Sequence, residues 1–93
     1  MQIIRDRNYL ANLDIILDYI ARDSLNKAIK FLNELDLAIQ QIPNFPYKFR
    51  KSFYHNGENV RDFIFKGYTI PYLVDINKHK IIILDIFKWL DKQ

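Results

Sequence analysis

Residues that could take part in chemistry are mostly basic or aromatic in this chain, and they are concentrated in its second half. Residues 43–93 hold nine basic and five acidic side chains, whereas residues 1–42 hold five and six. Phosphates could be neutralised by Lys48, Arg50, Lys51, Arg61, Lys66 and Lys88, and bases could stack on Tyr54, Tyr68, Tyr72 and Trp89. A basic half favours phosphate-rich or acidic partners, although lysines kept only for solubility would give the same count.

Arg61 is the most specific of these residues. It precedes Phe63 and Phe65 by even steps, so in a β-strand it shares their face and is partly buried. A guanidinium in that position needs an anionic partner. Two alternatives are open: an internal ion pair with Asp85, which lies among isoleucines, or an interaction with a substrate phosphate or a partner's acid.

The other aromatic residues have a structural interpretation that competes with a binding one. The spacing of four phenylalanines is that of a strand with one buried face, which predicts that they lie in the core: Phe49, Phe53, Phe63 and Phe65. Tyr68 and Tyr72, four residues apart on a strand, point the same way and are expected to be half-buried with satisfied hydroxyls. Lys88 follows the last apolar run, either as a solubilising end or as a cation at the edge of a site.

Several enzyme classes are disfavoured by the residues available. The chain has no cysteine, which removes thiolate nucleophiles, disulfides and cysteine-bound zinc. Its two histidines have no partners at metal-ligand spacing, so we expect neither a metal nor a cofactor. Gly57 and Gly67 are its only glycines, too few for a loop that cradles phosphates.

Two amphipathic helices are predicted in the first half, after a short strand at residues 2–5. One apolar stripe consists of Tyr9, Leu13, Ile16, Leu17 and Ile20, and the next of Ala28, Phe31, Leu32, Leu35, Ile39 and Ile42. Ser24 can cap the second helix, which Pro43 and Pro46 end. Because the break between the helices is short, they should form an antiparallel hairpin.

Strands are predicted for the second half, where the apolar period changes to two. Residues 48–53 alternate, Asn56-Gly57 is a strong hairpin signal, and strands follow at residues 60–66, 68–76 and 80–88. The last strand is apolar on both faces, as expected of a central strand covered on both sides. Pro71 should face an unpaired side or a bulge. The predicted fold is α+β, in the order β-α-α-β-β-β-β, with the helical hairpin packed on a mostly antiparallel sheet.

The length predicts a single domain, residues 1–93. Near the N-terminus, charged residues stand where a signal peptide would need an apolar run, and the longest aliphatic run is 81–84. These features predict a cytoplasmic protein that makes no contact with a membrane.

The order and spacing of these segments resemble the RelE/ParE superfamily of bacterial toxins from type II toxin–antitoxin systems. The resemblance runs through residues 13–24, 28–46 with Arg50, 60–63, 67–72 and 83–88. The helical hairpin looks closer to the ParE branch than to the RelE branch. This resemblance implies a small toxin that arrests growth by binding an essential target, until a cognate antitoxin wraps around it and folds on binding.

The two branches imply different targets. ParE-like members inhibit DNA gyrase, whereas RelE-like members cut mRNA in the ribosome without a metal. For a RelE-like nuclease, the resemblance implies that Arg61 and Lys88 stabilise charge at the phosphate and that Tyr72 orients the substrate or acts as an acid. Operator DNA would be contacted only through the antitoxin. A third alternative is an inactive relative that only binds the antitoxin.

Two departures from the family pattern weaken the case for RNA cleavage. Thr69 stands where the family often has an arginine, and no histidine, tyrosine or arginine follows Lys88. General acid–base chemistry needs a proton donor and acceptor near the scissile phosphate, and an unperturbed lysine is a poor base. The sequence therefore favours a ParE-like toxin that meets its target through Lys48, Arg50, Lys51, Lys66, Tyr68 and Trp89.

Overall fold

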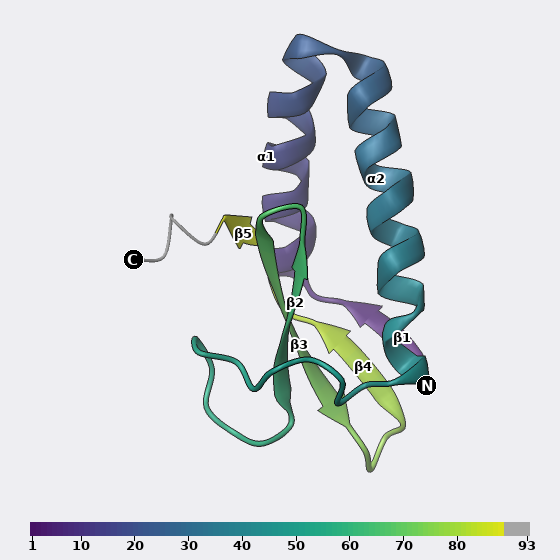
Figure 1. Cartoon of the computed structure of the whole chain (residues 1–93), viewed down its shortest axis with the longest axis vertical. Helices are drawn as coiled ribbons and strands as arrows, with labels where there is room; N and C mark the ends of the chain where they lie inside the picture. Colours follow the sequence, from purple (N-terminus) through teal and green to yellow (C-terminus); the bar gives the residue numbers. More distant parts are fainter. Residues whose placement is uncertain (89–93) are drawn as a thin grey trace.

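The computed structural model describes residues 1–88, which form a helical hairpin packed on a mixed sheet (Figure 1). In chain order, the elements are β1 (Gln2–Arg5), α1 (Arg7–Asp23), α2 (Leu25–Gln40), the 3-10 helix η1 (Ile42–Asn44), β2 (Val60–Phe65), β3 (Tyr68–Asp75), β4 (Lys80–Ile83) and β5 (Phe87–Lys88). The predicted α+β class and the predicted helical hairpin are both confirmed. No helix in this part of the chain is long and apolar enough to cross a membrane.

Caps set the ends of the two helices. The Asp6 side chain accepts a hydrogen bond from the Asn8 amide at 3.0 Å and so begins α1. Ser24 ends α1, since its own amide donates to the Ile20 carbonyl at 3.0 Å. It also begins α2, because its hydroxyl accepts from the Lys27 amide at 3.3 Å. Ser24 is therefore the C-cap of α1 and the N-cap of α2. Because a single residue separates the two helices, the chain reverses sharply and the helices form an antiparallel hairpin.

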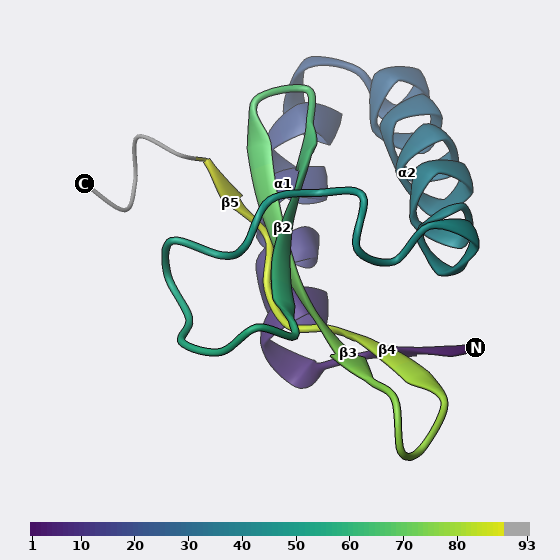
Figure 2. The ribbon, with the colours of Figure 1, turned by 60° about the horizontal axis from the view of Figure 1, so that its bottom comes forward.

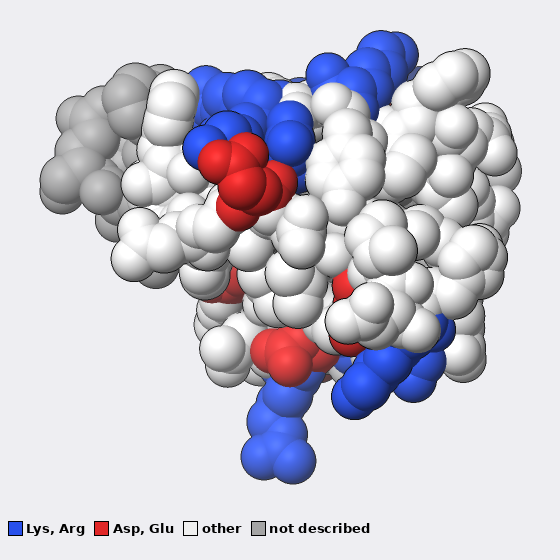
Figure 3. All heavy atoms as spheres, turned by 90° about the horizontal axis from the view of Figure 1, so that it is seen from below, with Lys and Arg blue, Asp and Glu red and all other residues white. Residues whose placement is uncertain are grey.

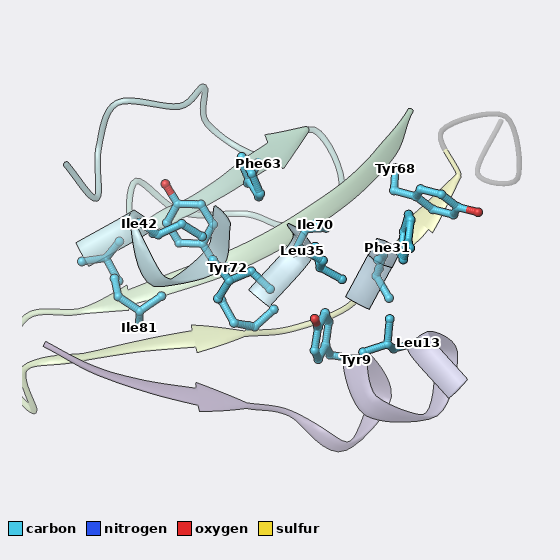
Figure 4. Packing of buried hydrophobic residues seen from close by; sticks show 14 residues of the cluster. Tyr9, Leu13, Phe31, Leu35, Ile42, Phe63, Tyr68, Ile70, Tyr72 and Ile81 are labelled. Carbon is cyan, nitrogen blue, oxygen red and sulfur yellow. The ribbon is translucent and has the colours of Figure 1, made fainter. Parts of the chain in front are cut away.

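The hydrophobic core lies between the hairpin and one face of the sheet (Figure 4). The figure shows Tyr9 and Leu13 pointing from α1 toward Phe31 and Leu35 of α2. The sheet contributes Phe63, Tyr68, Ile70, Tyr72, Val74, Ile81 and Ile83. Burying an aliphatic or phenyl side chain of this size contributes about 1.5–3 kcal/mol, so the helical stripes predicted from the sequence carry much of the stability.

The strand order is β1-β4-β3-β2, and β5 pairs with β3 beyond the end of β4. Strands β1 and β4 run parallel, while the other pairs are antiparallel. The two-residue turn Lys66-Gly67 joins β2 to β3 with φ of 49° and 84°. Positive φ at both positions is the type I′ geometry, whose twist matches that of the flanking strands. This turn fixes Arg61 opposite Tyr72 in the β2–β3 register.

The strand predicted over residues 80–88 is interrupted opposite Pro71. The Leu84 amide donates to the Pro71 carbonyl at 2.9 Å, but proline has no N–H to return to this segment. Asp85 then accepts from the Ile86 amide at 2.8 Å and from Asn12 Nδ2 at 2.6 Å, so its side chain holds the chain outside the ladder. The position predicted for Pro71, at a break in pairing, is confirmed. The prediction of one continuous last strand is wrong.

The strand predicted at residues 48–53 is also wrong. That segment belongs to the loop of residues 45–59, here called the edge loop, and only Lys51 forms a β-bridge, to Arg61. Phe53 was expected in the core, yet it is 73% exposed. Gly57 has a φ of 109°, and the Asn56-Gly57 pair lies in an open loop instead of a two-residue hairpin turn.

The edge loop wraps around the free edge of β2. It starts on the helix side of the sheet, where the Phe49 ring is 5.0 Å from that of Phe63. It passes the edge at Lys51 and reaches the opposite face, where the Phe53 amide donates to the Asp62 side chain at 3.2 Å. Figure 2 shows the loop crossing β2 before it returns to the start of that strand. The edge of β2 is therefore covered by the loop and contacted on both faces.

Candidate functional site

Tyr72 lies opposite Arg61 on the helix-facing side of the sheet. Its side chain is completely buried, and its hydroxyl donates a hydrogen bond to the Pro46 carbonyl at 2.6 Å. Burial raises the pKa of Tyr72 to about 12, although the nearby Arg61 charge opposes this rise. The hydroxyl thus stays protonated at neutral pH and directs its proton to the edge loop, an arrangement suited to positioning the loop.

The Arg61 guanidinium is bound by backbone carbonyls of the edge loop. Nε and Nη2 donate to the Glu58 carbonyl at 3.2 and 3.1 Å, and Nη1 donates to the Phe49 carbonyl at 3.1 Å. The guanidinium carbon also lies 4.9 Å from the centre of the Tyr47 ring. The internal pair with Asp85 is therefore wrong, because Asp85 bonds elsewhere. Arg61 instead joins the beginning of the edge loop to its end.

Lys88 lies apart from these two residues. It pairs with Tyr68 across β3 and β5, and its Nζ is 5.7 Å from the centre of the Tyr68 ring. Tyr68 and Tyr72 are four residues apart on β3, which places Lys88 about 13 Å along the sheet from the Arg61–Tyr72 pair. Of the three residues implied for RNA cleavage, Arg61 and Tyr72 are thus direct neighbours across β2 and β3, whereas Lys88 lies four residues farther along β3.

A groove of about 510 Å³ runs between α1 and β5 beside Lys88. It is lined by Asn12, Ile15, Ile16, Tyr19, Tyr68, Ile86, Phe87 and Lys88. Its lining combines apolar side chains with hydroxyl, amide and ammonium groups. Such a lining suits a side chain or short segment of another macromolecule better than a small charged substrate.

The other predicted binding residues are spread over the surface. Lys51 pairs with Glu58 at 2.8 Å, and Lys66 pairs with Glu34. Lys48 projects from the edge loop, with its Nζ 5.6 Å from the centre of the Phe49 ring. On the face seen in Figure 3, basic side chains form separate groups near the margins, some beside acidic ones. Trp89 lies outside the described residues.

Arg50 differs from the other cations because it is held by a buried acid. Its Nη2 lies 3.6 Å from Oδ2 of Asp62, a side chain that is 0% exposed, while Arg50 itself is 44% exposed. Its guanidinium carbon is 4.0 Å from the centre of the Phe53 ring. Arg50 is therefore both ion-paired and stacked, with part of its surface still open to solvent.

The sequence did not single out Asp62. Oδ2 accepts the Phe53 amide and faces Arg50, while Oδ1 has no hydrogen-bond partner within residues 1–88. Burying a carboxylate with incomplete pairing is costly, and the Arg50 cation and the Phe53 amide offset part of that cost. A signal was present, since Asp62 is a charged residue inside the apolar strand of residues 60–65.

The predicted site residues are largely engaged by other groups of the chain. Within residues 1–88, no three histidine, cysteine, aspartate or glutamate side chains gather as a metal site would require. The candidate general acid is engaged by a carbonyl, and the candidate arginine by two further carbonyls. On the edge loop, the rings of Phe45, Tyr47 and Phe53 are exposed, and the Arg50 guanidinium lies against that of Phe53.

The fold of residues 1–88 defines a small α+β protein whose long helical hairpin covers one face of a mostly antiparallel sheet. The family described as ParE toxin of type II toxin-antitoxin system, parDE, matches residues 3–88, and the chain belongs to this family. The resemblance drawn from the sequence, including its ParE side, is thereby confirmed.

A solved structure supports the same fold. The chain is similar to one from "Chromosomal ParDE TA system from P. aeruginosa", with a TM-score of 0.74, 21% sequence identity and 95% of each chain covered. At this identity the likeness establishes the fold alone. No curated protein sequence matches the chain.

Proposed function

We propose that this protein is the toxin of a type II toxin–antitoxin system, and that it arrests growth in the cytoplasm by binding DNA gyrase until a cognate antitoxin neutralises it. The observation that carries the proposal is the ParE toxin family match over residues 3–88. The ParDE title of the similar structure supports an antitoxin partner. ParE-like members of the superfamily inhibit gyrase, and this supports gyrase as the proposed target.

The geometry of the site supports binding over RNA cleavage. Tyr72 and Arg61 direct their polar atoms to carbonyls of the edge loop, and Lys88 is about 13 Å away along β3. A nuclease of the RelE kind needs such groups around one scissile phosphate. In this proposal Lys48, Arg50 and Lys88 face the target, while Arg61 and Tyr72 hold the edge loop in place.

Inducible expression in a sensitive bacterial host tests the proposal. From one culture, mRNA 5′ ends and gyrase–DNA breaks trapped with detergent are mapped before and after induction. We expect growth arrest with DNA breaks and intact messages. New mRNA ends within translated codons, without DNA breaks, would replace the gyrase target by the ribosome. Harmless expression would leave only a protein that binds antitoxin.

A purified assay isolates the target. Gyrase supercoiling of relaxed plasmid is measured with increasing toxin, and then with toxin mixed beforehand with the antitoxin. We expect inhibition by toxin alone and recovery with the antitoxin. Supercoiling that continues unchanged at saturating toxin would remove gyrase as the target.

A further inference from the structure

Phe53 and Arg50 form a stacked pair on the outer part of the edge loop. The Phe53 ring is 73% exposed, and the Arg50 guanidinium carbon lies 4.0 Å from its centre. This distance is within the range at which a cation and an aromatic face attract each other. An exposed phenylalanine carrying a planar cation combines two residue kinds that suit protein contacts, since arginine and aromatic side chains are enriched where interfaces are most energetic.

A buried acid fixes both members of this pair. Oδ2 of Asp62 accepts the Phe53 amide at 3.2 Å and lies 3.6 Å from Arg50 Nη2, while the Asp62 side chain is 0% exposed. The loop is held on either side of the pair as well, because Arg61 binds the carbonyls of Phe49 and Glu58. The pair is therefore organised before any partner arrives, which lowers the entropy lost on binding.

The surrounding charges favour a protein partner over a nucleic acid. A nucleic acid strand needs a row of cations free to meet its phosphates. Near the pair, however, Lys51 is bound to Glu58 and Arg61 to backbone carbonyls. The basic groups seen in Figure 3 are also separated by other surface. Arg50 remains 44% exposed beside one exposed ring, which suits a single carboxylate next to an apolar side chain.

We propose that Arg50 and Phe53 are the anchor through which this toxin binds an acidic segment of its target protein, an inference that rests on the proposed function. A carboxylate of the target pairs with the solvent-facing side of the Arg50 guanidinium. An apolar side chain of the same segment packs on Phe53. Asp62 is the positioning residue that holds both, and it does not touch the target.

Two truncations and a matched control test the anchor. Phe53→Ala removes the exposed ring on which Arg50 stacks, and Arg50→Ala removes the cation that pairs with Asp62. Phe45→Ala removes a phenylalanine of similar exposure, 70%, at the start of the same loop. Each protein is measured for inhibition of gyrase supercoiling, for antitoxin affinity and for thermal unfolding. We expect the first two variants to inhibit roughly thirtyfold less well. Phe45→Ala should change inhibition by less than about threefold, because a residue outside the anchor lies in the near-neutral part of an interface.

The remaining outcomes decide between partners. Antitoxin affinity should be unchanged in all three variants, and a parallel loss of antitoxin binding would assign the pair to the antitoxin. Equal inhibition by Phe53→Ala and the unchanged protein would overturn the anchor. So would the finding that the variants lose affinity for a single-stranded oligonucleotide instead of for gyrase.

Failure of the proposed function gives a different result. If the unchanged protein does not inhibit gyrase yet arrests growth, gyrase is the wrong target, and the anchor is then judged by growth alone. Phe53→Ala should still relieve the arrest, and full arrest by that variant would overturn the anchor whatever the target is. If the unchanged protein neither inhibits gyrase nor arrests growth, both proposals are wrong.

Discussion

Replacing Arg61 with alanine should destabilise the fold by loosening the edge loop, and this change separates a structural role from a catalytic one. The substitution removes the hydrogen bonds to the carbonyls of Glu58 and Phe49 and the contact with the Tyr47 ring. A hydrogen bond from a charged donor contributes about 1.5–3 kcal/mol when its partner stays buried. The Glu58 carbonyl is exposed and regains water, so only the part-buried Phe49 bond counts in full.

These contributions sum to a modest part of the total stability. With about 2 kcal/mol for the Phe49 bond and about 0.5–1 kcal/mol for the ring contact, Arg61→Ala should cost about 3 kcal/mol. A domain of this length has roughly 5–14 kcal/mol of unfolding free energy, so the variant should remain folded at room temperature. Arg61→Lys should keep the charge but lose the forked geometry of the guanidinium. Its unfolding free energy should lie between those of the unchanged protein and of Arg61→Ala.

Urea unfolding measures this loss. The slope of the unfolding free energy against urea, about 1–3 kcal/mol per molar for a small domain, should stay unchanged while the midpoint falls by roughly 1.5 M. Growth arrest should be weakened but not abolished, because the loosened edge loop no longer holds the Arg50–Phe53 pair in place while both of its side chains remain. An unfolding free energy within about 0.5 kcal/mol of the unchanged protein, together with complete loss of toxicity, would refute the structural role and place Arg61 at the target.

Three further predictions concern the turn, the helix cap and alkaline pH. Gly67→Ala should cost about 1 kcal/mol in thermal unfolding from backbone strain alone, since φ is 84° and no atom beyond the two neighbouring residues lies within 4 Å of the added methyl group. Ser24→Ala should cost about 1 kcal/mol, seen as an earlier melt of the helical circular dichroism signal, because the Lys27 amide loses its acceptor. Burial raises the pKa of Tyr9 and of Tyr72 to about 12, whereas in the unfolded chain both ionise near pH 10. The stability that the two hydroxyls contribute is therefore complete below about pH 10 and is lost toward pH 12. The unfolding free energy should fall by up to about 1.4 kcal/mol per pH unit for each tyrosine. Urea unfolding across that range should show the loss and Tyr72→Phe should halve it, whereas a flat profile would contradict the burial of both hydroxyls.

The helical half could be predicted from the sequence because its information is local. The stripe spacing of both helices and the cap at Ser24 depend on residues within one or two turns, and the structure uses them as expected. The break opposite Pro71 could also be predicted, because it follows from a missing N–H group. What could not be predicted is that Asp85 would hold the chain out of the ladder, since this depends on Asn12, far away in sequence.

The edge loop could not be predicted, because its polar and apolar residues alternate as in a strand although the segment forms only one β-bridge. Strand pairing there is limited to Lys51, and the loop is held instead by side chains of β2 and β3 that bind its carbonyls and amides. In the candidate site, the pairing of Arg61 with Tyr72 could be predicted from the sequence. The backbone carbonyls to which their side chains bind could not. Backbone carbonyls carry no sequence signature, so neither the guanidinium contacts nor the position of Phe53 could be read from residue types.

The position of β4 has a consequence for when the fold can be completed during synthesis. β4 pairs with both β1 and β3, yet it follows residues 1–79 in the chain. The helical hairpin and the β2–β3 hairpin have local contacts and can form early, whereas β1 joins the sheet only through β4, a contact that spans almost eighty residues. A nascent chain that ends before residue 83 therefore lacks part of the strand that joins β1 to β3, so its sheet cannot be completed.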